Sequence, residues 1–226
     1  MSLMIEGGRR LSGDLTVQGA KNSVLPILAA CILSGDVCIL QRCPHLEDVD
    51  TSIDILRHLG CAVRWNGPDL EVDSSTLTRW DIPDRLMRRM RSSVVFLGAI
   101  LARCGQAELS YPGGCAIGAR PVDLHLSALE KMGARFDLED GYILGRCRKL
   151  NGAHIHFDFP TVGGTENLLM AAALADGETP QLLLVPNDGE PETQASTVQY
   201  IEATDTEPAR YEALLLESGL FALTLQ

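Results

Sequence analysis

The residues best suited to chemistry lie in one stretch, S-Y-P-G-G-C-A-I-G-A-R-P-V-D-L-H, at positions 110–125. It places the thiol of Cys115 five residues before Arg120. A guanidinium beside a thiol favours the thiolate, which is the nucleophilic form, and it also binds anions. The glycines around the cysteine let the backbone make tight turns. The same pattern is typical of a Gly-rich turn with an incidental cysteine, so spacing alone leaves both interpretations open.

The overall composition is that of an ordinary globular chain, with 46% hydrophobic and 22% charged residues among 226. A net charge of −11 argues against a general nucleic-acid binder. The most apolar window, Val24 to Leu33, is too short to cross a bilayer, and no signal-peptide pattern opens the chain. The seven cysteines form no C-x-x-C pair, which predicts a reducing compartment, no disulfide framework and no zinc site. We therefore expect a cytoplasmic protein that binds neither nucleic acid nor membrane.

The elements that would position the cysteine stretch recur along the chain in the order helix, strand, loop, helix, strand, strand. In the first unit we expect them at 23–35, 37–40, 42–50, 51–60, 62–65 and 70–72, with Asn66-Gly67 as the hairpin turn. In the second unit we expect a helix, a strand, a helix and two strands at 94–105, 107–110, 124–133, 135–138 and 142–144. A third unit begins near Gly164, with a helix ending at Gly177 and a strand over 181–185.

The first helix of each unit is apolar on nearly all sides, which is typical of a buried helix. These segments are 24–33, 94–101 and 168–174. The repeat of about 70 residues is longer than the roughly 20–50 residues of solenoid proteins. We therefore predict an α/β fold of three pseudo-repeats that is inside-out, with the helices buried and the sheets outside.

Polar residues head these three buried helices, namely Lys21-Asn22, Arg91 and Thr165-Glu166-Asn167. If the units converge, the three helix ends share one face of the domain. Helix N-termini attract anions through unpaired N–H groups and the helix dipole. We expect Lys21, Arg91 and Arg120 to form a cationic cluster beside Cys115, although each charge taken alone is typical of a solvated surface.

Four motifs carry a resemblance to a known family: G-A-K-N-S at 19–23, M-R-S-S at 90–93, the motif at 112–125 and G-A-H-I at 152–155. From about Ile5 to Asp176 the chain resembles the UDP-N-acetylglucosamine 1-carboxyvinyltransferases, the enolpyruvyl transferases of peptidoglycan synthesis. That family has two inside-out α/β domains of three repeats each, with buried helices.

The resemblance also implies how the chain is divided. It implies that residues 1–20 form a strand segment packed with the second domain. Residues 21–226 would form the domain that carries the cysteine loop, which is the stretch around Cys115 at 110–125. We expect its repeats at about 21–90, 91–163 and 164–226, the last one divergent, and we expect the second family domain to be absent from this chain.

The resemblance implies transfer of the enolpyruvyl group of phosphoenolpyruvate to the 3′-hydroxyl of UDP-N-acetylglucosamine, with release of phosphate. By this resemblance Cys115 would be the general acid and would form an adduct with phosphoenolpyruvate. Cys115 would also be the site that fosfomycin alkylates. Lys21 and Arg120 would be the other catalytic residues. No metal or organic cofactor is implied. The substrate-binding positions carried over are Lys21, Asn22, Arg91, Arg120, Pro121, Val122, Asp123, Leu124, Thr161, Val162 and Gly163.

The sequence departs from the family pattern in two places. Phe159-Pro160 stands where many members carry a lysine, and the match fades after Asp176, although Glu190-Pro191-Glu192 fits the family. We expect the isolated chain to be weak or inactive and to associate with a second domain or with itself. The alternatives are a non-catalytic single-domain relative that binds a nucleotide sugar or a partner, and an enolpyruvyl transferase for a different acceptor such as shikimate 3-phosphate. The cysteine loop argues against the latter, since that relative does not use it.

Overall fold

The computed structural model describes residues 8, 13–14, 19–111, 122–157, 161–177, 182–184, 194–201 and 210–214. Its helices are α1 (Lys21–Ser34), α2 (Glu47–Leu59), α3 (Asp84–Met87), the 3-10 helix η1 (Arg91–Val95), α4 (Phe96–Cys104), α5 (Asp123–Lys131) and α6 (Val162–Ala172). The first seven strands are β1 (Val37–Leu40), β2 (Ala62–Asn66), β3 (Asp69–Asp73), β4 (Asp81–Ile82), β5 (Gln106–Ser110), β6 (Arg135–Glu139) and β7 (Tyr142–Arg146). The last four are β8 (Ile155–His156), β9 (Leu182–Leu184), β10 (Gln194–Ile201) and β11 (Arg210–Leu214).

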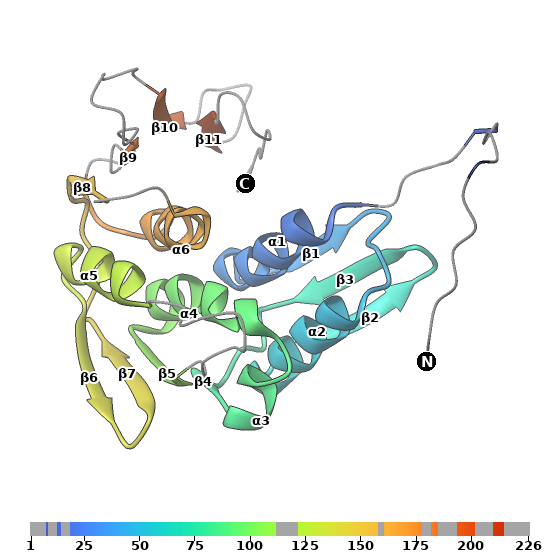
Figure 1. The fold of residues 1–226 in the computed structure, drawn as a ribbon, viewed down its shortest axis with the longest axis horizontal. Coiled ribbons are helices and arrows are strands. Elements are labelled where there is room, and N and C mark those ends of the chain that lie inside the picture. Colours follow the sequence, from blue (N-terminus) through green and yellow to red (C-terminus); the bar gives the residue numbers. More distant parts are fainter. Residues whose placement is uncertain are drawn as a thin grey trace.

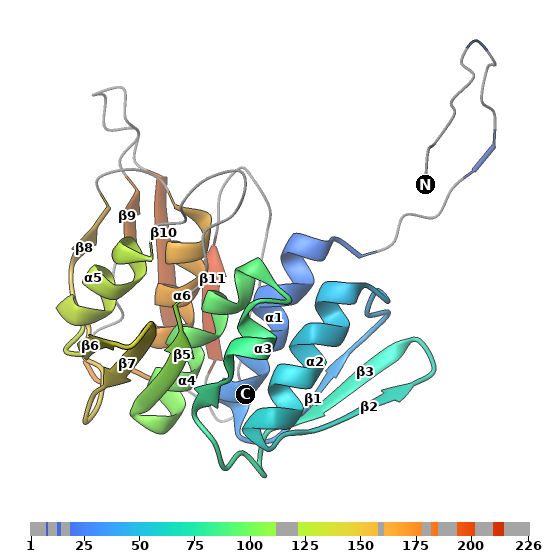
Figure 2. The ribbon, with the colours of Figure 1, turned by 60° about the horizontal axis from the view of Figure 1, so that its bottom comes forward.

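Three sheets surround a central group of helices (Figure 1). The first has the strand order β1-β3-β2 and is antiparallel throughout. The second has the order β4-β5-β7-β6, in which only the β4–β5 pair is parallel. The third has the order β11-β10-β9-β8 and lies beside α6 (Figure 2). In each of the last two sheets, a short strand from the preceding sequence unit pairs in parallel: β4 with β5 in the second sheet and β8 with β9 in the third.

Helices α1, α4 and α6 contact one another in the centre of the molecule. Leu28 and Ile32 of α1 and Leu97 and Ile100 of α4 have no exposed surface. Burying each such side chain stabilises the fold by about 1.5–3 kcal/mol. The α/β fold with buried helices and outer sheets is therefore confirmed.

Several helices begin earlier than we predicted, and α1, for example, begins at Lys21 rather than at position 23. The loop expected over 42–50 includes the first turn of α2, which begins at Glu47. Helix α6 begins at Val162 rather than near Gly164, and it ends at Ala172 rather than at Gly177. Glu47, Asp48 and Asp50 stabilise the start of α2 through the helix dipole. The hairpin turn is also one residue later than predicted, because Asn66 pairs with Asp69 and leaves Gly67-Pro68 as the loop.

A glycine allows α4 and α6 to approach closely. A Cβ on Gly98 of α4 would lie 2.3 Å from the backbone oxygen of Asn167 in α6. Real Cβ atoms do not come that near to a backbone atom, so only glycine fits without moving one helix. Gly60, with φ +101°, ends α2 in the left-handed conformation that favours glycine.

The third sheet differs in topology from the second. In the second sheet β5 pairs with β7, and helix α5 and strand β6 intervene in the sequence. In the third, β9 pairs with β10 and β10 pairs with β11, and these three are consecutive among the strands that the structure describes. Strands β10 and β11 lie within residues 193–226, a segment for which the sequence predicted no element. Within the described part of the chain, no helix is both long and apolar enough to cross a membrane.

Candidate active site

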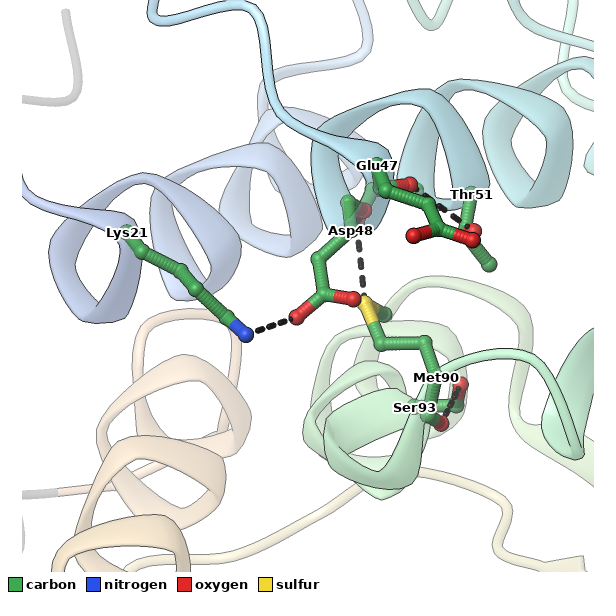
Figure 3. A network of polar contacts seen from close by, with 7 residues as sticks. Lys21, Glu47, Asp48, Thr51, Met90 and Ser93 are labelled. Atoms are coloured by element: carbon green, nitrogen blue, oxygen red, sulfur yellow. Dashed lines mark hydrogen bonds and ion pairs between the residues drawn. The ribbon is translucent and has the colours of Figure 1, made fainter. Parts of the chain in front are cut away.

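Lys21 and Asn22 are the first residues of the buried helix α1, and both are exposed. The Nζ atom of Lys21 lies 2.5 Å from Oδ2 of Asp48, which is in the first turn of α2 (Figure 3). The Asp48 side chain is 22% exposed, whereas that of Lys21 is 56% exposed. The lysine charge is therefore balanced by a carboxylate and held in one direction.

A chain of contacts links this ion pair to η1 (Figure 3). The Ser52 hydroxyl donates to the backbone oxygen of Asp48 at 2.9 Å and also lies 3.5 Å from Sδ of Met90. The Ser93 hydroxyl donates to the Met90 carbonyl oxygen at 2.5 Å. Arg91 follows Met90 and begins η1. The starts of α1, α2 and η1 therefore lie together.

A second network joins η1 and α4 to the starts of α5 and α6. The buried Asn167 side chain accepts a hydrogen bond from the Gly98 N–H at 2.6 Å and donates to the Val94 carbonyl oxygen at 3.0 Å. Its Nδ2 atom is also 2.8 Å from Nδ1 of His125. An amide nitrogen only donates, so Nδ1 accepts and the neutral ring carries its proton on Nε2. Burial lowers the pKa of His125, which keeps the ring neutral.

His125 brings together the two segments that the resemblance assigns to the nucleotide. It follows Asp123 and Leu124 in α5, and its ring lies against Gly163 of α6, where a Cβ would be 3.3 Å from Cε1. Asp123 is exposed, Leu124 is half-buried and Val122 is buried. Thr161 caps α6, because its hydroxyl accepts from the Gly164 N–H at 3.2 Å. Val162, in the first turn of α6, is 77% exposed, which is unusual for an apolar side chain.

Several predicted residues lie outside this description. Cys115, Arg120 and Pro121 are not among the described residues, nor is Phe159-Pro160, and for Arg91 only the backbone is described. The cationic cluster beside Cys115 therefore stays a prediction. In the described part, Lys21 and Asn22 at the start of α1 are linked through η1 to the segment around Gly163.

Two residues of this region differ from what the sequence suggested. Thr165 and Asn167 were expected at a helix end but lie buried in the first two turns of α6, because the helix starts at Val162. Glu166 lies between them, and burial raises its pKa to about 7.

Sequence reasoning missed the roles of Asp48 and His125. Asp48 carried one signal, its place in an acidic cluster that is typical of a helix start. The contact of His125 with Asn167 spans 42 positions and left no local signal. Among the described residues no group of three or more His, Cys, Asp or Glu side chains could hold a metal ion.

The comparisons with known proteins agree on a family. The family model described as EPSP synthase (3-phosphoshikimate 1-carboxyvinyltransferase) matches residues 5–186. The chain therefore belongs to the EPSP synthase family, whose fold it shares. The crystal structure of the enolpyruvyl transferase NikO from Streptomyces tendae is similar, with a TM-score of 0.65, 25% identity and coverage of 80% of this chain and 42% of that one. The EPSP synthase from Acinetobacter baumannii, with a TM-score of 0.58 and 14% identity, covers 93% of this chain and 48% of its own, and shows the fold alone.

Within the family, the curated relatives point to one subgroup. A UDP-N-acetylglucosamine 1-carboxyvinyltransferase of Nitratidesulfovibrio vulgaris (strain DP4) is 58% identical over 177 residues, which cover 78% of this chain and 42% of the relative. A relative of the same name from Oleidesulfovibrio alaskensis is 57% identical with the same coverage. One from Lawsonia intracellularis is 52% identical, again over 78% and 42%. The resemblance inferred from the motifs is confirmed, and the chain spans less than half the length of these relatives.

Proposed function

We propose that this chain contributes the cysteine-loop part of a UDP-N-acetylglucosamine 1-carboxyvinyltransferase. The observation that carries the proposal is the 58% identity over 177 residues to a relative of that name. The reaction would move the enolpyruvyl group of phosphoenolpyruvate to the 3′-hydroxyl of UDP-N-acetylglucosamine and release phosphate. We place this reaction in the cytoplasm, in the synthesis of peptidoglycan.

The residues around Lys21 support the proposal, because their arrangement suits the anionic groups of the substrates. Helix α1 has no acidic residue in its first turn, so its unpaired N–H groups and its dipole favour a phosphate or carboxylate near Lys21. Lys21 adds a cation held by Asp48, and Asn22 beside it adds an amide donor. We propose that Lys21 and Asn22 bind phosphoenolpyruvate and that Arg91 and Arg120 complete its recognition through paired N–H donors.

We propose Cys115 as the general acid of the reaction. A thiol has a pKa near enough to neutrality to transfer a proton at physiological pH, and the guanidinium of Arg120 would tune it. The segment from Arg120 to Leu124, with Thr161, Val162 and Gly163, would hold the uridine nucleotide. His125 links these two segments through its contact with Gly163.

The domain limits are part of this proposal. We propose one domain over 21–226 with repeats near 21–90, 91–163 and 164–226, and we assign 1–20 to a segment that packs with a second domain. Full turnover would need that second domain, because closing a site excludes water and strengthens its charges. The 226 residues by themselves are therefore proposed to be weak or inactive.

Acceptor binding tests the proposal directly. The midpoint of thermal unfolding of the 226-residue chain should rise with UDP-N-acetylglucosamine and stay unchanged with shikimate 3-phosphate. The Asp123→Ala variant should reduce the shift, whereas Asp137→Ala, an exposed aspartate on β6, should leave it unchanged. A shift with shikimate 3-phosphate alone would favour the other acceptor, and a shift with neither would contradict nucleotide-sugar binding by this chain.

A further inference from the structure

Two cysteines face each other at the end of α1. The helix ends at Ser34, Gly35 turns the chain in the left-handed conformation, and β1 runs back along α1, which it contacts. Along β1, Val37 and Ile39 point outward, with exposures of 46% and 64%. Cys38 alternates with them, so its side chain points toward the core and toward Cys31 on α1.

The two thiols and one hydroxyl form a small polar cluster. Cys31 and Ser34 are three residues apart on α1, so their side chains are neighbours on one face of the helix, and β1, which carries Cys38, packs against α1. The Cys38 thiol also lies 3.3 Å from the Ser34 hydroxyl oxygen. The Cys31 thiol is 3.3 Å from the Ile27 carbonyl oxygen inside the helix. Cys31 is 4% exposed, whereas Cys38 is only half-buried on an edge strand of its sheet.

This arrangement gives the two thiols opposite acid–base behaviour. The hydrogen bond from Cys31, assisted by Ser34, lowers the pKa of Cys38 to about 6 against burial and the nearby carboxylate of Asp36. The same hydrogen bond, with burial, raises the pKa of Cys31 well above its ordinary value. The half-buried Cys38 therefore loses its proton more readily, and the buried Cys31 keeps its proton to higher pH. That division is typical of a reactive cysteine beside a resolving one.

We propose that Cys31 and Cys38 form a redox-sensitive thiol pair that small-molecule disulfides such as oxidised glutathione convert to an intramolecular disulfide. In the first step the Cys38 thiolate attacks one sulfur of glutathione disulfide, and the S–S bond breaks with loss of one glutathione thiolate. In the second step Cys31 gives its proton to that thiolate and attacks the Cys38 sulfur, releasing the second glutathione. The two protein thiols are oxidised by two electrons, and the glutathione disulfide is reduced to two thiols.

The other described cysteines provide a contrast. Burial raises the pKa of Cys43, Cys104 and Cys147, and it raises that of Cys61 to about 11. Cys147 is partly exposed like Cys38. Cys147 is therefore a matched control, because its side chain is partly exposed but its pKa is not lowered.

The thiol pair is separate from the candidate active site. Lys21 and Cys38 lie at opposite ends of α1, a helix of 14 residues. Such a helix is about 20 Å long. Reaction at Cys38 is therefore independent of the proposed transferase function, and either proposal can fail without the other.

The test uses the reduced Cys115→Ser chain, so that the loop cysteine does not compete for reagent. The folded protein is treated with oxidised glutathione, quenched with acid, alkylated and mapped by mass spectrometry. We expect a Cys31–Cys38 disulfide, with Cys147 alkylated and unoxidised. A further Cys31→Ser change should trap glutathione on Cys38, and a Cys38→Ser change should abolish both products.

Each result bears on the proposal. Glutathione that remains on Cys38 while Cys31 is intact would overturn the resolving role of Cys31. Oxidation of Cys147 as fast as Cys38, or no reaction at all, would overturn the activation of Cys38. If Cys31→Ser does not fold, acid quenching of the parent chain at early times must still show glutathione on Cys38 before the disulfide forms.

Discussion

At the scale of single residues, the ion pair between Lys21 and Asp48 gives the candidate site its best-described charge. An exposed pair of this kind contributes little to stability, about 0–1 kcal/mol. The ion pair matters because it holds the lysine side chain in one orientation, whereas an unpaired lysine side chain samples many rotamers. Asp48 is therefore proposed to position Lys21 for an anionic substrate.

The variant Asp48→Asn tests this positioning role. We expect it to slow alkylation of Cys115 by fosfomycin about tenfold, since misplacement of a binding group reduces rates by such factors. The free energy of unfolding should change by less than about 1 kcal/mol. Asp50→Asn is the matched control, because Asp50 lies exposed in the same helical turn. Equal rates in the two variants would show that Asp48 does not position Lys21.

Glu166 predicts a pH dependence of stability. Burial raises its folded-state pKa to about 7 from an ordinary value of 4.5. The unfolded chain therefore ionises first as pH rises, and the native state loses stability from pH 4.5 until about pH 7. The Glu166→Gln variant lacks this loss, so its stability advantage over the parent should grow across that window, by roughly 1–2 kcal/mol after allowance for solvent screening.

Chemical denaturation of both proteins at several pH values measures this difference. The titration of His125 contributes equally to the pH dependence of stability in both proteins, so the difference between them reports on Glu166. A constant difference between pH 4 and pH 8 would show that Glu166 does not titrate abnormally.

At the scale of elements, the sequence predicted where most helices end more reliably than where they begin. Gly35, Gly60 and Gly105 each end a helix in the left-handed conformation, as their positions suggested. The starts carried weaker signals. The residues before α1 and α2 are Ala20 and Leu46, neither of which caps its helix with a side chain. At α6 the cap is Thr161, but the following Gly163-Gly164 argued against a helix there.

The contacts that assemble the site could not be read from the sequence. Asp48 meets Lys21, and His125 meets Asn167, only after the units have packed. The apolar character of α1, α4 and α6 predicted that these helices meet in the core, and this is confirmed. Which polar side chains then pair is decided by packing distances that no local pattern encodes.

The contact between α4 and α6 gives a prediction at this scale. Gly98→Ala should lower stability by about 1–3 kcal/mol, because its Cβ would meet the backbone of Asn167 and one helix must shift. Gly163→Ala is the comparison, since its Cβ would meet the His125 ring at 3.3 Å, a side chain that has more freedom to move. Thermal unfolding should show the larger loss for Gly98→Ala. An equal or smaller loss would contradict the close approach.

At the scale of the whole molecule, three sheets surround a core of helices, and we propose that the start of α1 with Lys21 forms part of an anion-binding face. Family membership and the curated relatives give this face its proposed substrates. Because the chain covers 42% of such a relative, we propose that the 226 residues bind substrate groups without completing the reaction efficiently. Phosphate release from phosphoenolpyruvate and UDP-N-acetylglucosamine should therefore be slight, and rates equal to those of a full-length relative would contradict that expectation.

The most direct test of the central claim is the site at which fosfomycin reacts with the folded chain. Its phosphonate and epoxide should be directed by Lys21 and Arg120 to the thiol of Cys115. Peptide mapping by mass spectrometry is predicted to find the adduct on Cys115, with slower labelling in Lys21→Ala and none at that position in Cys115→Ser. An adduct that forms equally on Cys38, or no adduct at all, would contradict the account.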